Sequence, residues 1–198
     1  MNLKKQKIAL IFKTVASLCF IVLGVKAYLI NNSKILLLFV IGMLFDGLGD
    51  VLLGIRNIAF KEKMFLFGTY SFMIGHIFYL AALIYKDWSN IALILLIAAI
   101  LTCIYFYFTY HHCKLKKIQY FILPIYALMI YGIMVFGIYN YLNVSSTNNL
   151  AFMIGAIMFA CSDTVLSFYN FGNRKGWMHP VYSFLYYVGQ LLIALSLF

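Results

Sequence analysis

The chain has 198 residues, of which 65% are hydrophobic and only 10% are charged, and its mean hydropathy is +0.97. A soluble domain of this size would not keep so much apolar surface in water. The composition therefore predicts an all-α, polytopic membrane bundle. The net charge of +10 could indicate a nucleic-acid partner. We expect none, because Lys and Arg gather in short loops, as they do on the cytoplasmic side of membrane proteins.

Seven apolar segments approach or exceed the roughly 20 residues that cross a bilayer. Their predicted ranges are 8–30, 35–55, 64–85, 90–110, 118–142, 149–170 and 179–198. The loops between them are short, so consecutive helices should be antiparallel neighbours. We interpret residues 1–198 as a single transmembrane domain.

The distribution of Lys and Arg predicts the orientation of the chain in the cell membrane. Few cations fall near one side, namely Lys26, Lys34 and Lys86. Most fall on the other side: Lys4, Lys5, Lys7, Arg56, Lys61, Lys63, Lys114, Lys116, Lys117, Arg174 and Lys175. We therefore expect a cytoplasmic N-terminus and an external C-terminus.

Three of the five acidic residues, Asp46, Asp50 and Asp163, lie inside apolar segments. Each would cost about 2.5–3.5 kcal/mol at the centre of a membrane helix, so such acids usually face a protein interior and carry function. The spacing of Asp46 and Asp50 puts both on one helix face. If two of the acids share a site, repulsion would keep one protonated as a general acid and leave the other as an anionic stabiliser or base. A structural role, through pairing with Lys13 or a tyrosine hydroxyl, is the alternative.

Other polar residues fall at similar depths in the predicted helices. His76 is followed one turn later by Tyr79, and the last segment carries Tyr186, Tyr187 and Gln190. Nearly all of these polar groups fall in the cytoplasmic half, which predicts one polar cavity open toward the cytoplasm. The His and Cys spacings match no metal site, so we expect no metal and no cofactor.

An internal repeat is also predicted. Three echoes occur at nearly equal offsets: Gly49-Asp50-Val51-Leu52 with Ser162-Asp163-Thr164-Val165, Tyr70-Ser71-Phe72 with Tyr182-Ser183-Phe184, and Gly75-His76 with Gly189-Gln190. They suggest two related groups of three helices, joined by the fourth, in a parallel 3+1+3 arrangement.

The ordered set of motifs resembles the YhhN-like family, the lysoplasmalogenase family, over nearly the whole chain. The motifs are Lys13, Gly49-Asp50-Val51-x-Leu53, Gly75-His76-x-x-Tyr79, Leu123-Pro124-x-Tyr126, Gly155-Ala156-x3-Ala160-x-Ser162-Asp163 and Tyr186-Tyr187-x-x-Gln190. Two features depart from the family. Thr14 follows Lys13 where members usually have proline, and seven segments are found where eight are usual.

The resemblance implies hydrolysis of the vinyl ether bond of lysoplasmenyl-ethanolamine or -choline to a fatty aldehyde and a glycerophospho-alcohol. It implies carboxylate acid–base catalysis by Asp50 and Asp163 with His76, and no cofactor. The partners would be the lysophospholipid and the bilayer, while the oligomeric state is left open. The residues expected to bind substrate are Lys13, Asp46, Tyr79, Tyr126, Ser162, Tyr186, Tyr187 and Gln190.

Two other functions are compatible with the pattern. A parallel repeat with intramembrane acids is also the plan of small-solute transporters such as the sugar-transporting SWEET proteins, where the acids would bind substrate or protons. A bundle that binds lipid without catalysis is the second alternative.

Overall fold

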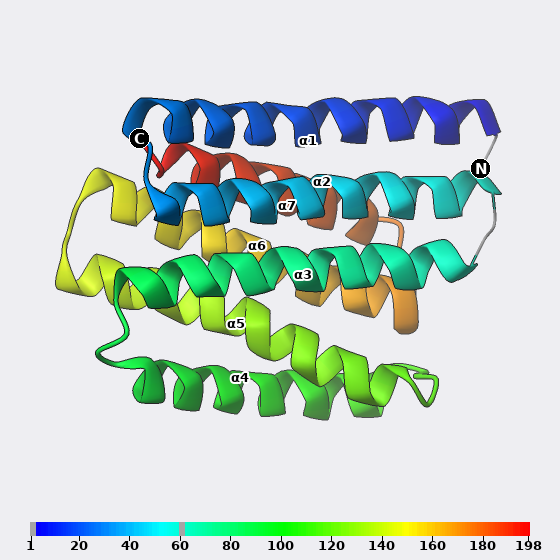
Figure 1. Ribbon diagram of the computed structural model, residues 1–198. Helices are drawn as coiled ribbons and strands as arrows, with labels where there is room; N and C mark the ends of the chain where they lie inside the picture. The colour runs from blue at the N-terminus through cyan, green and yellow to red at the C-terminus, as the bar shows by residue number, and fades with distance from the viewer. Residues whose placement is uncertain (1–2, 60–61) are drawn as a thin grey trace. The chain divides into compact units, whose positions relative to one another are not determined.

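The computed structural model describes residues 3–59 and 62–198, and the regular structure of this part is entirely α-helical (Figure 1). This confirms the predicted all-α class. Lys61 and the side chains of Lys4 and Lys5, used above to predict orientation, lie outside the described part. The helices are α1 (Leu3–Asn31), α2 (Lys34–Ala59), α3 (Glu62–Lys86), α4 (Ile91–His112), α5 (Gln119–Asn143), α6 (Thr147–Phe171) and α7 (Met178–Leu195).

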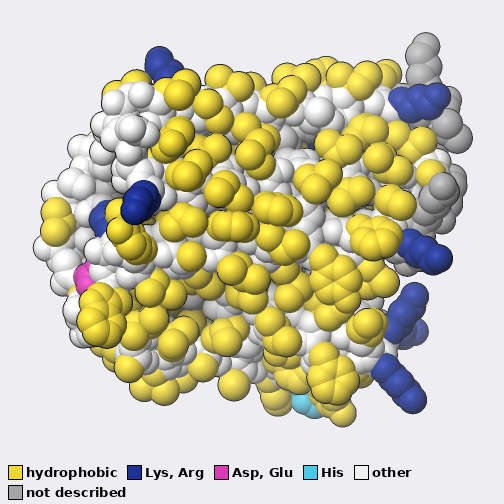
Figure 2. Space-filling view, viewed as in Figure 1, with side chains coloured by type: hydrophobic (Ala, Val, Ile, Leu, Met, Phe, Trp, Pro, Cys, Tyr) yellow, Lys and Arg dark blue, Asp and Glu magenta, His cyan; other side chains and the backbone are white. Residues whose placement is uncertain are grey.

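Among the described residues, six helices, α1 to α6, are long and apolar enough to cross a membrane. Helix α7 has 18 residues, and its polar His179 and Gln190 lower its hydropathy. Hydrophobic side chains cover most of the face in Figure 2. Large exposed hydrophobic residues of the described part include Phe12, Leu29 and Phe121. Such an extensive apolar surface suits lipid. The chain is therefore a multi-pass membrane protein, and its orientation stays a prediction.

The structure divides into two compact units, which are described separately. The first contains α1–α3 and ends at Lys86, and the second contains α4–α7 and begins at Asp87. The internal repeat predicted that the fourth segment connects two groups of three helices. In the structure, α4 packs with α5 and α6. The single domain and the internal repeat stay predictions.

In the first unit, α2 lies between α1 and α3 (Figure 1). Glycines on alternate sides of α2 let both neighbours approach closely. A Cβ built on Gly42 would come 2.5 Å from the Tyr79 ring in α3, and one on Gly49 would also meet an α3 side chain. Gly47 and Gly54 instead lie against side chains of α1. Helix α2 is thus fixed from both sides.

In the second unit, α6 packs against α7, α5 and α4. Its tightest approach is to α7, where Gly155 lies against the backbone of Gly189. The intramembrane acids of the first unit are on α2 and Asp163 is on α6, and each of these helices packs against more than one neighbour.

Candidate functional site

The two carboxylates of α2 are buried and reach different neighbouring helices. Asp46 is 0% exposed, and its Oδ1 lies so close to Gly75 of α3 that a Cβ there would be 2.5 Å away. Asp50 is 6% exposed, and its Oδ2 accepts a 2.6 Å hydrogen bond from Ser17 Oγ of α1. Asp46 and Asp50 therefore share one face of α2, as their spacing predicted, and this face borders both α1 and α3. The Asp50 carboxyl points to α1 and the Asp46 carboxyl points to α3.

Lys13 belongs to the same cluster as Asp50. It stands one turn before Ser17 on α1, whose hydroxyl lies 2.9 Å from the Lys13 carbonyl oxygen and 2.6 Å from Asp50 Oδ2. Pairing with Lys13 was the structural role that the sequence left open for these acids. Lys13 and the hydroxyl that contacts Asp50 therefore lie on the same face of α1, and the pairing itself stays a prediction.

His76 and Tyr79 of α3 are both fully buried, and their ring centroids are 6.5 Å apart. Gly75, the residue before His76, leaves the space that the Asp46 carboxylate occupies. The first unit therefore carries a lysine, two acids, an imidazole and a phenol on three helices. Ser17 is the member that the sequence analysis missed, although its one-turn spacing from Lys13 could have indicated it.

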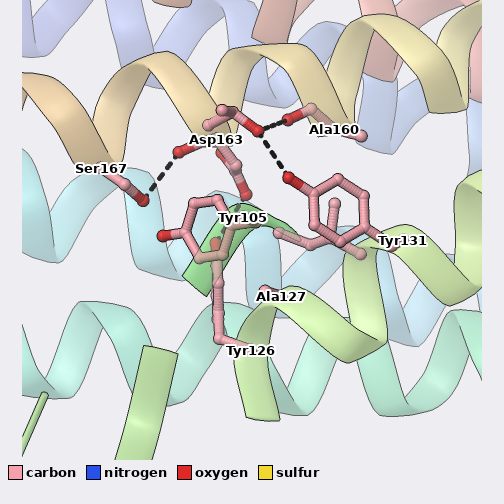
Figure 3. A pocket seen from close by; sticks show the side chains of 9 residues that line it. Tyr105, Tyr126, Ala127, Tyr131, Ala160, Asp163 and Ser167 are labelled. Atoms are coloured by element: carbon pink, nitrogen blue, oxygen red, sulfur yellow. Dashed lines mark hydrogen bonds between the residues drawn. The ribbon is translucent and has the colours of Figure 1, made fainter. Parts of the chain in front are cut away.

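In the second unit, Asp163 is 6% exposed and its Oδ2 accepts a 2.7 Å hydrogen bond from the Tyr126 hydroxyl of α5. The Asp163 carboxyl lines a small, partly open pocket with room for about one water molecule. Tyr105 of α4 and Tyr131 of α5 line the same pocket and lie around the acid (Figure 3). The pocket is therefore an acidic site surrounded by phenols.

Hydroxyl groups complete this pocket. The Tyr131 and Thr164 hydroxyls lie 3.0 Å apart, and Ser167 Oγ donates to the Asp163 carbonyl oxygen at 2.9 Å (Figure 3). Tyr105 lies beside Ser167. The sequence analysis missed these four lining residues. Ser167 could have been found from its position one turn after Asp163, but nothing distinguished the two tyrosines among sixteen.

The remaining predicted residues lie between α6 and α7. Ser162 Oγ donates to the Tyr182 carbonyl oxygen at 2.8 Å, so its hydroxyl joins these two helices instead of facing the pocket. Gln190 is fully buried, and the Tyr186 ring packs 4.9 Å from that of Tyr187.

Within residues 3–59 and 62–198, no group of three or more His, Cys, Asp and Glu side chains could hold a metal ion. The polar chemistry of both units consists of carboxyl, hydroxyl, phenol, imidazole, amide and ammonium groups. These groups can donate, accept and hold protons.

These features define the class of the protein: a multi-pass helical membrane protein with hydrogen-bonded carboxyl groups buried among its membrane helices. The sequence model of the YhhN family matches residues 8–197, nearly the whole chain. The chain therefore belongs to the YhhN family, as its ordered motifs predicted. No curated protein and no solved structure matches it.

Proposed function

We propose that this protein hydrolyses the vinyl ether bond of lysoplasmalogens and releases a fatty aldehyde and a glycerophospho-alcohol. The observation that carries the proposal is the buried Asp163 carboxyl, hydrogen-bonded to Tyr126 in a pocket among membrane helices. A lipid ether needs an acid that is held within apolar surroundings. Membership of the YhhN family and the resemblance of its motifs to lysoplasmalogenases also support the proposal.

The reaction requires an acid, a nearby anion and water. The acid protonates the β-carbon of the vinyl ether, and the electron pair of the C=C bond forms the new C–H bond. The resulting oxocarbenium ion is stabilised by an anion, as in glycoside cleavage by two carboxylates. Water then adds to the cation and loses a proton to a base. The hemiacetal so formed collapses to the aldehyde and the alcohol.

The residues predicted from the sequence supply these roles in the proposal. Asp50 and Asp163 are the acid and the anionic stabiliser. His76 and Gln190, both fully buried, position water or the glycerol hydroxyl. The Lys13 amino group binds the phosphate of the lipid in this proposal. The remaining binding residues of the proposal are Asp46, Tyr79, Tyr126, Ser162, Tyr186 and Tyr187.

The test is aldehyde release from lysoplasmenyl-ethanolamine and -choline by protein purified in detergent. A lysolipid with a saturated ether at the same position is the substrate control, because it has no double bond to protonate. We expect release only from the vinyl ethers, and its loss in Asp50→Asn and in Asp163→Asn. Asp87→Asn is the matched control, since Asp87 lies in the α3–α4 loop and bonds locally to Ser89.

No aldehyde from either lipid, with protein that is folded by circular dichroism, would overturn the proposal. Solute uptake coupled to protons, measured in vesicles containing the protein, would then be the next experiment. Unchanged turnover in either Asn variant would remove that aspartate from the chemistry.

A further inference from the structure

The α4–α5 and α6–α7 loops lie at the same end of the second unit and contact each other (Figure 1). The Lys114 backbone N–H donates a 2.8 Å hydrogen bond to the Phe171 carbonyl oxygen, at the end of α6. A Cβ built on Gly172 would come 2.8 Å from the Phe168 carbonyl oxygen and 3.2 Å from Cys113 Sγ. The two loops therefore pass each other closely and form one continuous surface.

This surface carries every Lys and Arg of the second unit, and each of these side chains is exposed. They are Lys114, Lys116 and Lys117 in the α4–α5 loop, and Arg174 and Lys175 in the α6–α7 loop. We call these five side chains the basic surface. The side-chain acids of the unit lie elsewhere. Asp87 stands at the opposite end of α4, and Asp163 stands about 12 Å before the end of α6.

The positive charge of the two loops has a known cause, but their arrangement does not follow from it. The preference for Lys and Arg on the cytoplasmic side concerns how many cations a loop carries, and it does not require two loops to join. Arg174 is also held in place. Its Nε donates to the Tyr169 carbonyl oxygen at 3.4 Å, and its guanidinium carbon lies 4.3 Å from the centre of the Tyr169 ring. Both groups are neutral, so a positioned guanidinium keeps its charge available for an anion such as phosphate.

Exposed aromatic rings indicate the depth at which the basic surface lies. Tyr110 in the last turn of α4 and Trp177 directly before α7 are each more than half exposed. The Tyr110 ring also packs 6.1 Å from the ring of Tyr120 in α5. Trp and Tyr are enriched where the apolar part of a membrane meets water. The cations between these rings are therefore at the level of the lipid headgroups.

We propose that the basic surface binds the headgroup phosphate of an anionic membrane phospholipid, such as phosphatidylglycerol, with cations from both loops contacting one headgroup. Clusters of Lys and Arg beside membrane helices attract anionic lipids. A zwitterionic headgroup carries its own ammonium group, which the cations repel, so it should bind less tightly. The site does not depend on the proposed function, whose substrates have ethanolamine or choline headgroups.

The chain contains a reporter for this lipid. Of its two tryptophans, Trp177 borders the basic surface and Trp88 lies before α4, at the other end of that helix. Trp88→Phe therefore leaves Trp177 as the single fluorophore. The protein is placed in vesicles of phosphatidylcholine and phosphatidylglycerol. Bromine atoms on the lipid chains quench a nearby tryptophan, so brominating one lipid at a time gives the relative binding constant of the two lipids beside Trp177.

We expect phosphatidylglycerol to bind beside Trp177 at least about fivefold more tightly than phosphatidylcholine, which is the contribution of one cation near a membrane surface. Trp177→Phe is the matched control, because it leaves Trp88 as the reporter at the other end of α4. It should show no preference of this size. Equal quenching of Trp177 by the two lipids would overturn the proposal.

Arg174→Lys separates a positioned site from a general positive field. It keeps the charge but loses the planar group that stacks on Tyr169. We expect it to lower the preference about two- to fivefold, the range for an exposed ion pair, and Lys114→Gln in the other loop to do the same. Lys34→Gln/Lys86→Gln removes two exposed cations of the first unit and should leave the preference unchanged. A wild-type preference in Arg174→Lys would contradict the proposed site.

Two further measurements test the joined loops and the identity of the anion. Gly172→Val keeps all five cations but forces the loops apart, so a wild-type preference in this variant, folded by circular dichroism, would contradict a site shared by both loops. Excess inorganic phosphate at constant ionic strength should not remove the preference, because the lipid is held in the bilayer beside the site. Loss of the preference under this condition would show that the surface binds free phosphate instead of a lipid.

Discussion

Gly155 and Gly189 pack backbone to backbone where α6 meets α7. A Cβ built on Gly155 would come 2.8 Å from the Gly189 carbonyl oxygen, and one built on Gly189 would come 2.9 Å from the Gly155 carbonyl oxygen. Both contacts are with backbone, which cannot turn aside as a flexible side chain can. Close packing of this kind is a main source of helix association in a membrane, where lipid is as apolar as the helices.

We expect Gly155→Ala and Gly189→Ala each to force α6 and α7 apart and to lower stability by about 1–3 kcal/mol, the usual cost of overpacking. Thermal unfolding in detergent measures the effect. Gly176→Ala is the matched control, because a Cβ there meets nothing within 4 Å. Equal melting temperatures for the three variants would contradict the close approach.

Ser17→Ala removes the hydroxyl that donates to Asp50 Oδ2. Leaving a buried oxygen without its hydrogen-bond donor costs about 1–3 kcal/mol, so we expect a clear fall in melting temperature. Thr14→Val is the control on the same helix, because its hydroxyl bonds only the Leu10 carbonyl oxygen one turn away. A fall as large in Thr14→Val would show that the Ser17–Asp50 contact adds little.

Tyr126→Phe removes the hydroxyl that donates to Asp163 and keeps the ring. Under the proposed function, loss of this bond should lower kcat by about ten- to a hundredfold, since each 1.36 kcal/mol is tenfold in rate. Tyr139→Phe is the control on α5, because it also loses a hydrogen bond, here 2.6 Å from Asn90 Nδ2. Equal turnover by the two variants would remove Tyr126 from the reaction.

Cys113 follows the last residue of α4 and packs against Gly172. Burial raises the pKa of its thiol, because it disfavours the thiolate. The thiolate is the reactive form, so the rate of labelling by a water-soluble maleimide should increase with pH. This increase should occur at a higher pH than for an exposed thiol. The measurement uses protein in which Cys19, Cys103 and Cys161 are replaced by Ala.

The same variant unfolded in dodecyl sulfate is the reference for this titration. In it the thiol is exposed, so its labelling should reach half its maximal rate at a lower pH. Coincident pH profiles for the folded and unfolded protein would show that Cys113 is not shielded.

Composition and spacing were enough to predict the helices and most of the buried polar residues. Long apolar runs are costly in water and therefore predict membrane helices. Asp46, Asp50 and Asp163 fall within these runs and so could be placed inside the helices. The direction of each carboxyl could not be predicted. Asp46 and Asp50 share a face, but Asp46 meets α3 and Asp50 meets α1, because that face lies over both neighbours. Such a choice depends on three-dimensional packing, which one helix does not specify.

The predicted echoes also differ in their packing. The serine of the Tyr-Ser-Phe echo stands closer to the following glycine in α3 (Ser71 and Gly75) than in α7 (Ser183 and Gly189). This echo is therefore out of register with the contacts of Gly75 with Gly42 and of Gly189 with Gly155. Ser71 Oγ donates to a carbonyl of α2 at 2.6 Å, whereas the bond from α6 to α7 is made by Ser162. The aspartate and glycine echoes share one register, and the aromatic one does not.

The flanked position of α2 has a consequence for biosynthesis. The partner of Asp50 comes from the helix made earlier, and the group against Asp46 comes from the helix made later. When α2 leaves the ribosome, α3 has not yet been made, so Asp46 lacks the helix against which it packs. Inserting this acid into lipid alone would cost about 2.5–3.5 kcal/mol. We expect the insertion machinery to retain α2 until α3 emerges, so that α1–α3 enter the bilayer together.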